Sequence, residues 1–377
     1  MRPWLVVASD FVRTGGMDVA NLGFAEYLGR GGKEVHLVTH RAEATLTKLP
    51  SVITHFVTRP LDSNLVGEML LGLVARSVYR QLKERLPIVV VNGGNARIPS
   101  AANWIHFVHK ASDPKLGCFR RLVRLRNVRR ERQALAGARV VVADSLRTAA
   151  DLRDQLGIEA ARIHTVYYGV DGRQFFPATA EQKACLAIDL MLSAHSYHAA
   201  FVGALGDGRK GFETVFGAWE MLERSGDWDV GLLVVGAGRE RERWIRLARD
   251  RQLRSIRFLG FRNDVSEIVK AVDLMVAPSR YEPYGLAVHE SLCCGTPAIV
   301  SGASGVAEQF TPELKGLLLD DPRSVKELAR KVTEWRANIE GYRRALAPLG
   351  ARLRLRSWDD MARDIVNLCE GIEQDVH

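Results

Sequence analysis

The sequence predicts an α/β fold built from two Rossmann-like, doubly wound domains. Short apolar runs rich in Val, Ile and Leu alternate with longer segments of helical periodicity, and the alternation starts again near the middle of the chain. These runs are continuously apolar, as expected for parallel strands that are buried on both faces. Repeated strand–helix alternation is typical of doubly wound sheets, and 377 residues suffice for two such domains.

The expected elements follow in chain order. The first series of strands covers Trp4–Ala8, Val35–Thr39, Ile88–Val91, Trp104–Val108, Val140–Ala143 and His164–Tyr168. The second series covers Ala200–Val202, Val230–Val235, Ile256–Leu259, Leu274–Ala277 and Ala298–Val300. The helices expected between them include Asp18–Arg30, Asn64–Arg85, Thr214–Leu222, Glu240–Arg251 and Val265–Ala271.

A polar, weakly periodic segment separates the two series. It contains Pro177 and the stretch 178–184, and we place the domain boundary near Asp171–Pro177. The two domains then cover residues 1–172 and 173–356. Open α/β sheets bind ligands at the carboxyl ends of their strands, so two such domains predict a deep interdomain cleft as the ligand site.

Composition narrows the possible functions. Hydrophobic residues make up 47% of the chain and charged residues 26%, which favours a packed soluble protein over a disordered one. No apolar run approaches the roughly 20 residues of a membrane-spanning helix, and the N-terminal run is too short for a secretory signal. Five cysteines without a CxxC pattern argue against a zinc module or a disulfide scaffold, and they favour a cytoplasmic location.

The segment 278–297, PSRYEPYGLAVHESLCCGTP, carries the clearest functional signal. It leaves a predicted strand, passes Glu282 in a loop and enters a helix near Gly285, with Glu290 about one turn inside it. Free N–H groups at a helix start can bind a phosphate, and a carboxylate such as Glu290 suits the two hydroxyls of a ribose. The N–H groups concerned belong to Tyr284, Gly285, Leu286 and Ala287. Taken alone, an N-capping acid and a surface glutamate would explain the two carboxylates as well.

Two further loops follow predicted strands. Arg209 and Lys210 lie after Ala200–Val202, where adjacent cations can hold a diphosphate and stabilise its growing charge. Gly15 and Gly16 precede the first helix, and glycine lets the backbone approach a ligand closely. Solvated surface and a tight turn are the alternative interpretations of these two loops.

Other chemistry-bearing patterns are assigned structural roles. Asp227–Trp228–Asp229 matches a D-x-D motif that can bind Mn²⁺ or Mg²⁺, but it precedes a strand and is interpreted as a turn. No other cluster has metal-ligand spacing, so we predict no metal. Cys293 and Cys294 point in different directions on a helix and are expected to pack in the core.

Several motifs in fixed order resemble those of the retaining family 4 (group 1) glycosyltransferases of the GT-B fold. The E-x7-E of EPYGLAVHE, preceded by a strand and PS and followed by CGTPAIV, resembles the donor-site signature of this family. TGGMDVANLGFAEYLGRGGKEVHLVT, GALGDGRKGF, LLVVGAGRERE and FLGFRNDVSEIVKAVDLMVAPS resemble its earlier motifs, so the similarity extends along nearly the whole chain. Within the family, bacterial lipopolysaccharide-core glucosyltransferases are somewhat similar.

The resemblance implies an activity. A sugar would pass from a UDP- or GDP-linked donor to a hydroxyl of a saccharide or lipid-linked glycan, in cell-envelope or polysaccharide biosynthesis. The anomeric configuration would be retained, the leaving phosphate would help to take the acceptor proton, and neither a metal nor another cofactor would be needed. A sugar-nucleotide epimerase on the same fold, or a non-catalytic nucleotide-binding protein, remains the alternative.

The resemblance also implies roles for individual residues. The catalytic group would comprise His106, Arg209, Lys210 and Glu282, with His109 as the alternative histidine near the sugar hydroxyls. The donor-binding group would comprise Gly15, Gly16, Gly203, Gly236, Arg262, Tyr284, Gly285, Leu286, Ala287 and Glu290. Many members have an arginine where this chain has Ala204, so the diphosphate contact would rest on Arg209 and Lys210.

The C-terminal segment 357–377 is expected to form a helix that crosses back to the first domain, as is common in the family. An apolar stripe at helical spacing supports a packed helix. It consists of Trp358, Met361, Ile365, Leu368 and Ile372.

The net charge of +9 permits anionic partners but selects none. Seven arginines lie between Cys118 and Ala134, and in similar bacterial enzymes the corresponding helix binds the membrane surface. Arg120, Arg121 and Arg124 are therefore candidates for contact with an anionic membrane or acceptor, and a solvated basic helix is the alternative. Without a recognisable nucleic-acid module we expect no nucleic-acid partner, and the sequence does not specify an oligomeric state.

Overall fold

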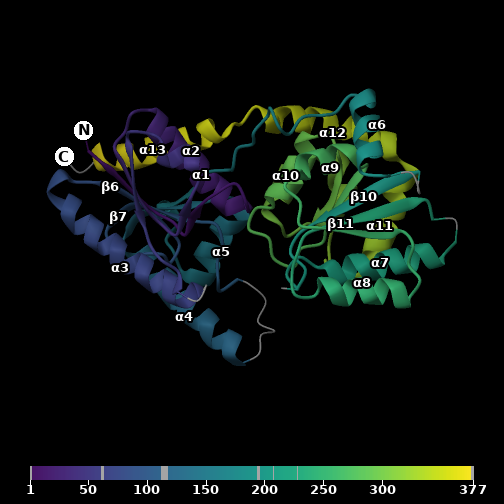
Figure 1. Ribbon diagram of the computed structural model, residues 1–377, viewed down its shortest axis with the longest axis horizontal. Coiled ribbons are helices and arrows are strands. Elements are labelled where there is room, and N and C mark those ends of the chain that lie inside the picture. Colours follow the sequence, from purple (N-terminus) through teal and green to yellow (C-terminus); the bar gives the residue numbers. More distant parts are fainter. Residues whose placement is uncertain are drawn as a thin grey trace. The chain divides into compact units, whose positions relative to one another are not determined.

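The computed structural model describes residues 2–60, 63–111, 118–192, 196–206, 208–226 and 228–374. The chain divides into two compact units, Met1–Gly169 with Arg356–His377 (unit 1) and Val170–Leu355 (unit 2) (Figure 1). The sequence pattern places these divisions at residues 172–173 and 356–357. Each unit has a parallel β-sheet with helices packed on it, which is the predicted doubly wound α/β architecture.

Unit 1 contains a seven-stranded sheet in the order β5-β3-β1-β6-β7-β8-β9. Its strands are β1 (Trp4–Val7), β3 (Val35–Thr39), β5 (Val52–Phe56), β6 (Ile88–Asn92), β7 (Ser100–Ile105), β8 (Ala138–Ala143) and β9 (Ile163–Thr165), and a separate pair is β2 (Asp10–Phe11) with β4 (Arg41–Ala42). Its helices are α1 (Gly16–Arg30), α2 (Ala44–Thr47), α3 (Asn64–Leu82), α4 (Cys118–Ala136), α5 (Leu146–Leu156) and α13 (Trp358–Gln374).

Successive side chains of the unit 1 strands are buried on opposite faces of the sheet. Leu5 and Val7 of β1 pack with Leu71 of α3 on one face. Trp4 of the same strand meets Phe24 of α1, with ring centroids 6.0 Å apart in an edge-on arrangement. Burial on both faces explains why the strands read as continuous apolar runs in the sequence.

Unit 2 contains a six-stranded parallel sheet in the order β12-β11-β10-β13-β14-β15. Its strands are β10 (Tyr197–Val202), β11 (Val230–Val235), β12 (Ile256–Gly260), β13 (Leu274–Ala277), β14 (Ala298–Ser301) and β15 (Leu318–Leu319). Its helices are α6 (Ala180–Asp189), α7 (Phe212–Arg224), α8 (Arg241–Asp250), α9 (Val265–Ala271), α10 (Leu286–Cys293), α11 (Val325–Ala337) and α12 (Ile339–Arg354).

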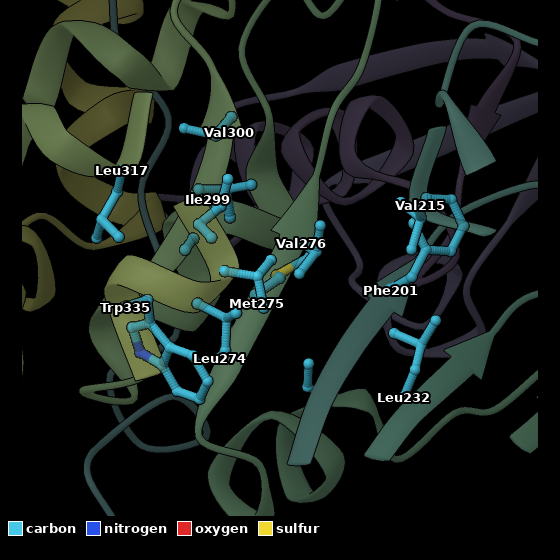
Figure 2. Packing of buried hydrophobic residues seen from close by; sticks show 14 of the residues in the cluster. Phe201, Val215, Leu232, Leu274, Met275, Val276, Ile299, Val300, Leu317 and Trp335 are labelled. Atoms are coloured by element: carbon cyan, nitrogen blue, oxygen red, sulfur yellow. The ribbon is translucent and has the colours of Figure 1, made fainter. Parts of the chain in front are cut away.

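The core of unit 2 follows the same alternation. Phe201 of β10 and Leu232 of β11 pack with Val215 of α7 in the larger cluster (Figure 2). Ala200 and Leu233, one position away on the same strands, belong to the cluster on the other face, together with residues of α9. Packed side chains cover both faces of the sheet. The candidate site residues therefore lie on the loops that follow the carboxyl ends of its strands.

Several strands differ from the expected bounds or are absent from the expected series, such as β9, which covers Ile163–Thr165 instead of His164–Tyr168, and β15; β7 and β5 show the physical reasons. β7 covers Ser100–Ile105 instead of Trp104–Val108, because the polar residues Ser100 and Asn103 are buried inside the strand and interrupt the apolar run. The side-chain amide of Asn103 donates a hydrogen bond of 3.0 Å to the carbonyl of Gly93. The edge strand β5 is missing from the predicted series because exposed positions break its apolar pattern. The earlier end of β7 puts both candidate histidines in the loop after the strand.

Helix α13 packs against α1 of unit 1. Met361 and Ile365 are fully buried, and Gly23 of α1 leaves room for the Trp358 side chain, which lies 3.1 Å from where a Cβ would be. Two ion pairs flank this contact: Arg30 of α1 pairs with Asp359 at 2.5 Å, and Lys33, which follows α1, pairs with Glu370 at 2.9 Å. The expected apolar stripe is thus covered by unit 1.

We expect Ile365→Ala to destabilise unit 1 by about 2–5 kcal/mol, since it removes a fully buried side chain from this contact. Hydrogen exchange should rise in α1 and β1 and stay unchanged in β10 and β11. The exposed neighbour Asn367→Ala is the control and should have little effect. Faster exchange confined to unit 2 would contradict the packing described here.

Candidate functional site

The loop after β13 lies against the loop after β10. The two strands are parallel neighbours, so their carboxyl ends meet at one edge of the sheet. The N–H of Arg280 donates to the carbonyl of Arg209 over 2.7 Å. Gly211, with a φ of 72°, lacks the Cβ that would overlap the carbonyl oxygen of Pro278. The two loops are therefore fixed to each other through their backbones.

Glu282 is the point where the side chains of these loops converge. Its Oε2 lies 2.5 Å from Lys210 Nζ and 3.6 Å from Arg209 Nη1, and it accepts a hydrogen bond of 3.2 Å from Ser279 Oγ. Burial would raise the pKa of Glu282, but the neighbouring Lys210 and Arg209 cations hold that pKa below its usual value. The structure thus brings three expected residues together. It adds Ser279, which lies in the quoted motif but was not singled out by any pattern.

A pocket borders this group at the start of α10. It is lined, among others, by Lys210, Ser279, Glu282, Gly285, Ala287 and Ser304. Gly285 is the N-cap residue with a φ of 110°, and α10 begins at Leu286. The first N–H groups of a helix have no acceptor within that helix, so they offer a binding site for an anion. Tyr284 differs from this group, since its ring is buried and its hydroxyl lies 2.6 Å from His289 Nδ1.

Gly203 and Gly236 lie where the loops after β10 and β11 touch. A Cβ at Gly236, whose φ is 148°, would overlap the carbonyl oxygen of Gly203. Backbone packing therefore explains the glycine at position 236. Arg262, after β12, forms an ion pair with Asp264, with 2.7 Å between Nε and Oδ1. The structure thus gives Gly236 and Arg262 roles within the fold of unit 2.

Glu290 differs from Glu282 in its charge state. It lies half-buried on α10, and burial raises its pKa to about 8. The carboxyl group is therefore mostly protonated at neutral pH, where it can both donate and accept hydrogen bonds. The two glutamates of the E-x7-E spacing have opposite pKa shifts.

The glycine loop of unit 1 precedes α1. Gly15 is the exposed N-cap residue with a φ of 95°, and Gly16 is the first residue of the helix. Asp18, in the first turn, has its pKa raised to about 7 by burial and by the nearby charge of Asp10. Asp10 itself is paired with arginines from β4 and from residue 59. The sequence pattern did not identify Asp10 and Asp18, because only the glycines of this loop form a recognisable motif.

His106 is buried among polar side chains. Its Nε2 lies 3.0 Å from Asn92 Nδ2, its Nδ1 lies 2.5 Å from the Tyr168 hydroxyl, and its ring packs against Trp104 at an angle of 48°. Burial lowers its pKa to about 3, so the ring stays neutral. Both ring nitrogens serve the fold, and a ligand could reach them only by breaking one of these contacts.

His109 lies three residues further along the same loop, and its side chain is 35% exposed. Its Nδ1 lies 3.3 Å from Glu131 Oε1, and its N–H donates to Glu131 Oε2 over 3.3 Å. Of the two histidines that the sequence leaves open, His109 has the more exposed side chain. Glu131 was visible only as the single acid in the arginine-rich run.

The arginines of α4 have different environments. The Arg121 side chain is exposed, whereas Arg124 donates to the carbonyls of His109 (3.0 Å) and Lys110 (2.7 Å). The side chain of Arg120 lies outside what the structure describes. Leu122 and Leu125 are 69% and 61% exposed. In the described part of the chain, no helix is both long and apolar enough to cross a membrane.

The other sequence patterns singled out above make contacts within the fold. Asp229 binds Arg336 through both carboxylate oxygens, while Asp227 lies outside the described residues. Among the described residues, no group of three or more His, Cys, Asp or Glu side chains could hold a metal ion. The absence of a metal stays a prediction. Cys293 and Cys294 are buried, as their expected packing role requires.

The comparisons with known proteins agree with this arrangement. The family described as Glycosyl transferases group 1 matches residues 194–347, and that described as Glycosyltransferase Family 4 matches residues 14–174. Together the two matches span most of both units. The chain belongs to the group 1 glycosyltransferases.

Individual related proteins align with nearly the whole chain of this glycosyltransferase. The D-inositol 3-phosphate glycosyltransferase of Salinispora tropica is 26% identical, over 94% of this chain and 80% of that protein. WaaG, a glycosyltransferase involved in lipopolysaccharide biosynthesis, has a similar structure with a TM-score of 0.81 and 18% identity, over 97% of this chain and 99% of its own. Anabaena Alr3699/HepE, in complex with UDP and glucose, has a TM-score of 0.74 and 18% identity, over 98% and 100%. The fold is therefore GT-B.

We predict that Glu290→Gln stabilises the glycosyltransferase at pH 8 by at least about 1 kcal/mol and leaves stability unchanged at pH 4.5. In the wild type the unfolded carboxyl group loses its proton near pH 4.5 and the folded one near pH 8, so stability falls as the pH rises between these values. Glutamine imitates the neutral form throughout.

Urea unfolding at the two pH values measures this difference. The exposed Glu84→Gln is the control and should change stability little at either pH. An equal effect of Glu290→Gln at both pH values would show that the raised pKa is not its cause.

Proposed function

We propose that this glycosyltransferase moves a sugar, with retention of its anomeric configuration, from a UDP- or GDP-linked donor to a hydroxyl of a saccharide or lipid-linked acceptor. The supporting observation is the contact of Lys210 and Arg209 with Glu282 beside the N-terminus of α10. Two cations and a helix N-terminus favour a diphosphate, and the adjacent carboxylate favours sugar hydroxyl groups.

In this proposal unit 2 binds the donor. Arg209 and Lys210 hold the diphosphate together with the first N–H groups of α10, and they stabilise the charge that grows on it during the reaction. Glu282 accepts hydrogen bonds from the sugar and orients the ring. Glu290 binds the ribose, where a protonated carboxyl group can donate to one hydroxyl and accept from the other.

The chemical step exchanges one bond of the anomeric carbon for another. The bond to the diphosphate oxygen breaks, and the acceptor oxygen forms the new bond on the same face, which retains the configuration. A phosphate oxygen of the leaving group takes the acceptor's proton. The protein's cations neutralise the leaving group, and the proposal includes neither a metal ion nor another cofactor.

The acceptor half of the proposal concerns unit 1. The similar proteins are named for D-inositol 3-phosphate and for lipopolysaccharide biosynthesis, and we propose an acceptor used in cell-envelope or polysaccharide synthesis. The N-terminal part of α3 lies beside α4, since Arg126 donates to the carbonyl of Leu65. Both helices carry exposed apolar side chains, namely Leu65, Val66, Met69 and Leu73 on α3 and Leu122 and Leu125 on α4. These, with exposed arginines, support peripheral contact with an anionic bilayer.

A donor screen tests the proposed activity. Thermal unfolding with UDP-, GDP- and ADP-linked sugars should reveal one nucleotide that raises the melting temperature, because binding to the folded state stabilises it. Glu290→Ala should lose most of this shift. Incubation with the donor alone should give slow hydrolysis or no reaction. An epimerised sugar nucleotide would support an isomerase, and no stabilisation by any nucleotide would overturn the donor site.

We predict that Glu282→Gln lowers turnover at least tenfold, since a hydrogen bond to a charged group is worth about 1.5–3 kcal/mol. The same change should tighten binding of the nucleoside diphosphate product, because Lys210 loses the carboxylate with which it is paired. Steady-state kinetics and calorimetry measure the two effects. Glu213→Gln, which removes the carboxylate paired with Arg280, is the matched control. Turnover within twofold of wild type would remove Glu282 from the site.

We predict that the protein sediments with anionic vesicles at low salt and is released as salt rises. Arg124 is hydrogen-bonded to a loop of unit 1, so its replacement would also change the fold. Exposed arginines of α4 therefore give a better test of surface charge. Replacing Arg121, Arg129 and Arg132 by Gln should reduce binding several-fold. The same number of exposed arginines of α8, Arg243, Arg246 and Arg249, are the control. Indifference to anionic vesicles at low salt, or equal loss in both sets, would end the membrane proposal.

A further inference from the structure

Four charged side chains lie together at the carboxyl edge of the unit 1 sheet. Asp10, Arg41 and Arg59 follow the ends of β1, β3 and β5 by two or three residues, and these three strands are parallel neighbours. Asp18 joins them from the first turn of α1. The carboxyl edge of an open parallel sheet is where such folds bind their ligands, so this cluster is placed to meet a substrate.

Asp10 holds both arginines. Its Oδ1 accepts a hydrogen bond of 2.8 Å from Arg41 Nε, and its Oδ2 accepts one of 3.3 Å from Arg59 Nη2. Burial would raise the pKa of Asp10, but Arg41 and Arg59 hold that pKa below its usual value, so the carboxyl group is ionised at neutral pH. One buried carboxylate therefore orients two guanidinium groups.

The loops that carry these residues are fixed to one another through their backbones. The N–H of His40 donates to the carbonyl of Ser9 over 2.9 Å, and the N–H of Val57 donates to the carbonyl of Thr39 over 2.8 Å. Nδ1 of His40 also lies 2.8 Å from the carbonyl oxygen of Val57. Groups that are fixed before a ligand arrives lose less conformational entropy when they bind it.

Several donors of the two arginines are not used within the fold. A guanidinium group has five N–H donors. Within the described ranges, the side chain of Arg41 forms a hydrogen bond only through Nε, and 58% of that side chain is exposed. Nε of Arg59 is buried and has no hydrogen-bond partner there, and the same holds for Oδ1 of Asp18. Because buried polar groups in folded proteins nearly always have partners, these groups point to a ligand.

Charge selects the class of that ligand. Arg41 and Arg59 outnumber the single ionised carboxylate of Asp10. Burial, together with the nearby charge of Asp10, raises the pKa of Asp18 to about 7, so Asp18 only partly offsets the remaining positive charge at neutral pH. The cluster therefore favours an anion. A phosphate matches two guanidinium groups well, because it offers several oxygens to their N–H donors.

We propose that Arg41 and Arg59 bind a phosphate group of the acceptor, so that the enzyme selects acceptors that carry a phosphate. This proposal rests on the glycosyltransferase activity proposed above and adds the chemical class of the acceptor. Asp10 orients the two guanidinium groups and does not itself touch the phosphate. A phosphate monoester of a soluble sugar and the phosphate of a lipid-linked acceptor offer the same oxygens, so the experiments below separate these two sources.

Inorganic phosphate is the first probe. It is titrated at pH 8 with a saturating nucleoside diphosphate from the donor screen, which fills the donor site, and it should raise the melting temperature of the wild type. Arg41→Gln should weaken phosphate binding at least about tenfold, as expected for a lost hydrogen bond between charged groups. Arg85→Gln is the matched control, because Arg85 pairs with Glu34 at the amino edge of the same sheet. Absence of phosphate binding in the wild type, or equal affinity in Arg41→Gln, would overturn the proposal.

Asp18→Asn tests the same contact in the opposite direction. At pH 8 most Asp18 side chains are ionised, and the charged groups around them are Asp10, Arg41 and Arg59. Asparagine removes a negative charge from beside the phosphate, so binding at pH 8 should tighten several-fold. A change that merely loosened the loop would weaken binding instead. Equal or weaker phosphate binding by Asp18→Asn at pH 8 would therefore overturn the proposal.

Sugar transfer separates the two sources of the phosphate. Sugars and their phosphate monoesters form one set of acceptors, and lipid-linked phosphates in vesicles form the other. In the set that the wild type uses, Arg41→Gln should lower kcat/KM for the acceptor at least about tenfold and leave the donor KM nearly unchanged. Equal transfer by the wild type and Arg41→Gln to an acceptor without phosphate would overturn the proposal. Phosphate binding that depends on Arg41, without transfer to any acceptor, would count against the proposed function alone.

Discussion

The pairing of β10 with β13 is the constraint on which the donor half of the site depends. These strands are distant in sequence but adjacent in the sheet, so the loops that follow them share one edge. The close approach of the two backbones then requires a residue without a Cβ at Gly211, opposite the carbonyl of Pro278. With the two loops this close, Lys210 reaches Glu282. Sheet order and the glycine at position 211 together allow this ion pair.

The same loop and helix give two glutamates different chemistry. Glu282 faces the cations of Lys210 and Arg209, which lower its pKa against the effect of burial. Among the described residues, no neighbouring cation lowers the pKa of Glu290 on the helix in this way, and burial raises that pKa to about 8. A pair of acids whose environments separate their pKa values can take separate tasks. Here one carboxylate is suited to accept from several hydroxyls, and the neutral one can also donate.

Much of the fold could be predicted because buried parallel strands leave a direct trace in hydropathy. Val265–Ala271 was predicted with the observed bounds, and Val230–Val235 likewise. The bounds of β7 could not be predicted correctly. Its buried Asn103 donates a hydrogen bond to a loop carbonyl, and no local sequence pattern indicates that bond. That shift also affects the site: position relative to the strand favoured His106, whereas its contacts with Asn92 and Tyr168 fix it in the interior of unit 1.

The basic character of α4 shows most clearly what a sequence cannot resolve. Arginines at 124, 126 and 130 donate to backbone carbonyls of His109, Leu65 and Gly94, which lie on three other segments of unit 1. Burial even lowers the pKa of Arg130. The arginines whose side chains the structure describes therefore form two sets, one that joins segments of the fold and one that stays exposed at residues 121, 129 and 132. The exposed set is the better placed of the two to contact an anionic surface, so the number of arginines in the helix overstates that attraction. The same helix, through Glu131, also sets the geometry of the loop that holds His109.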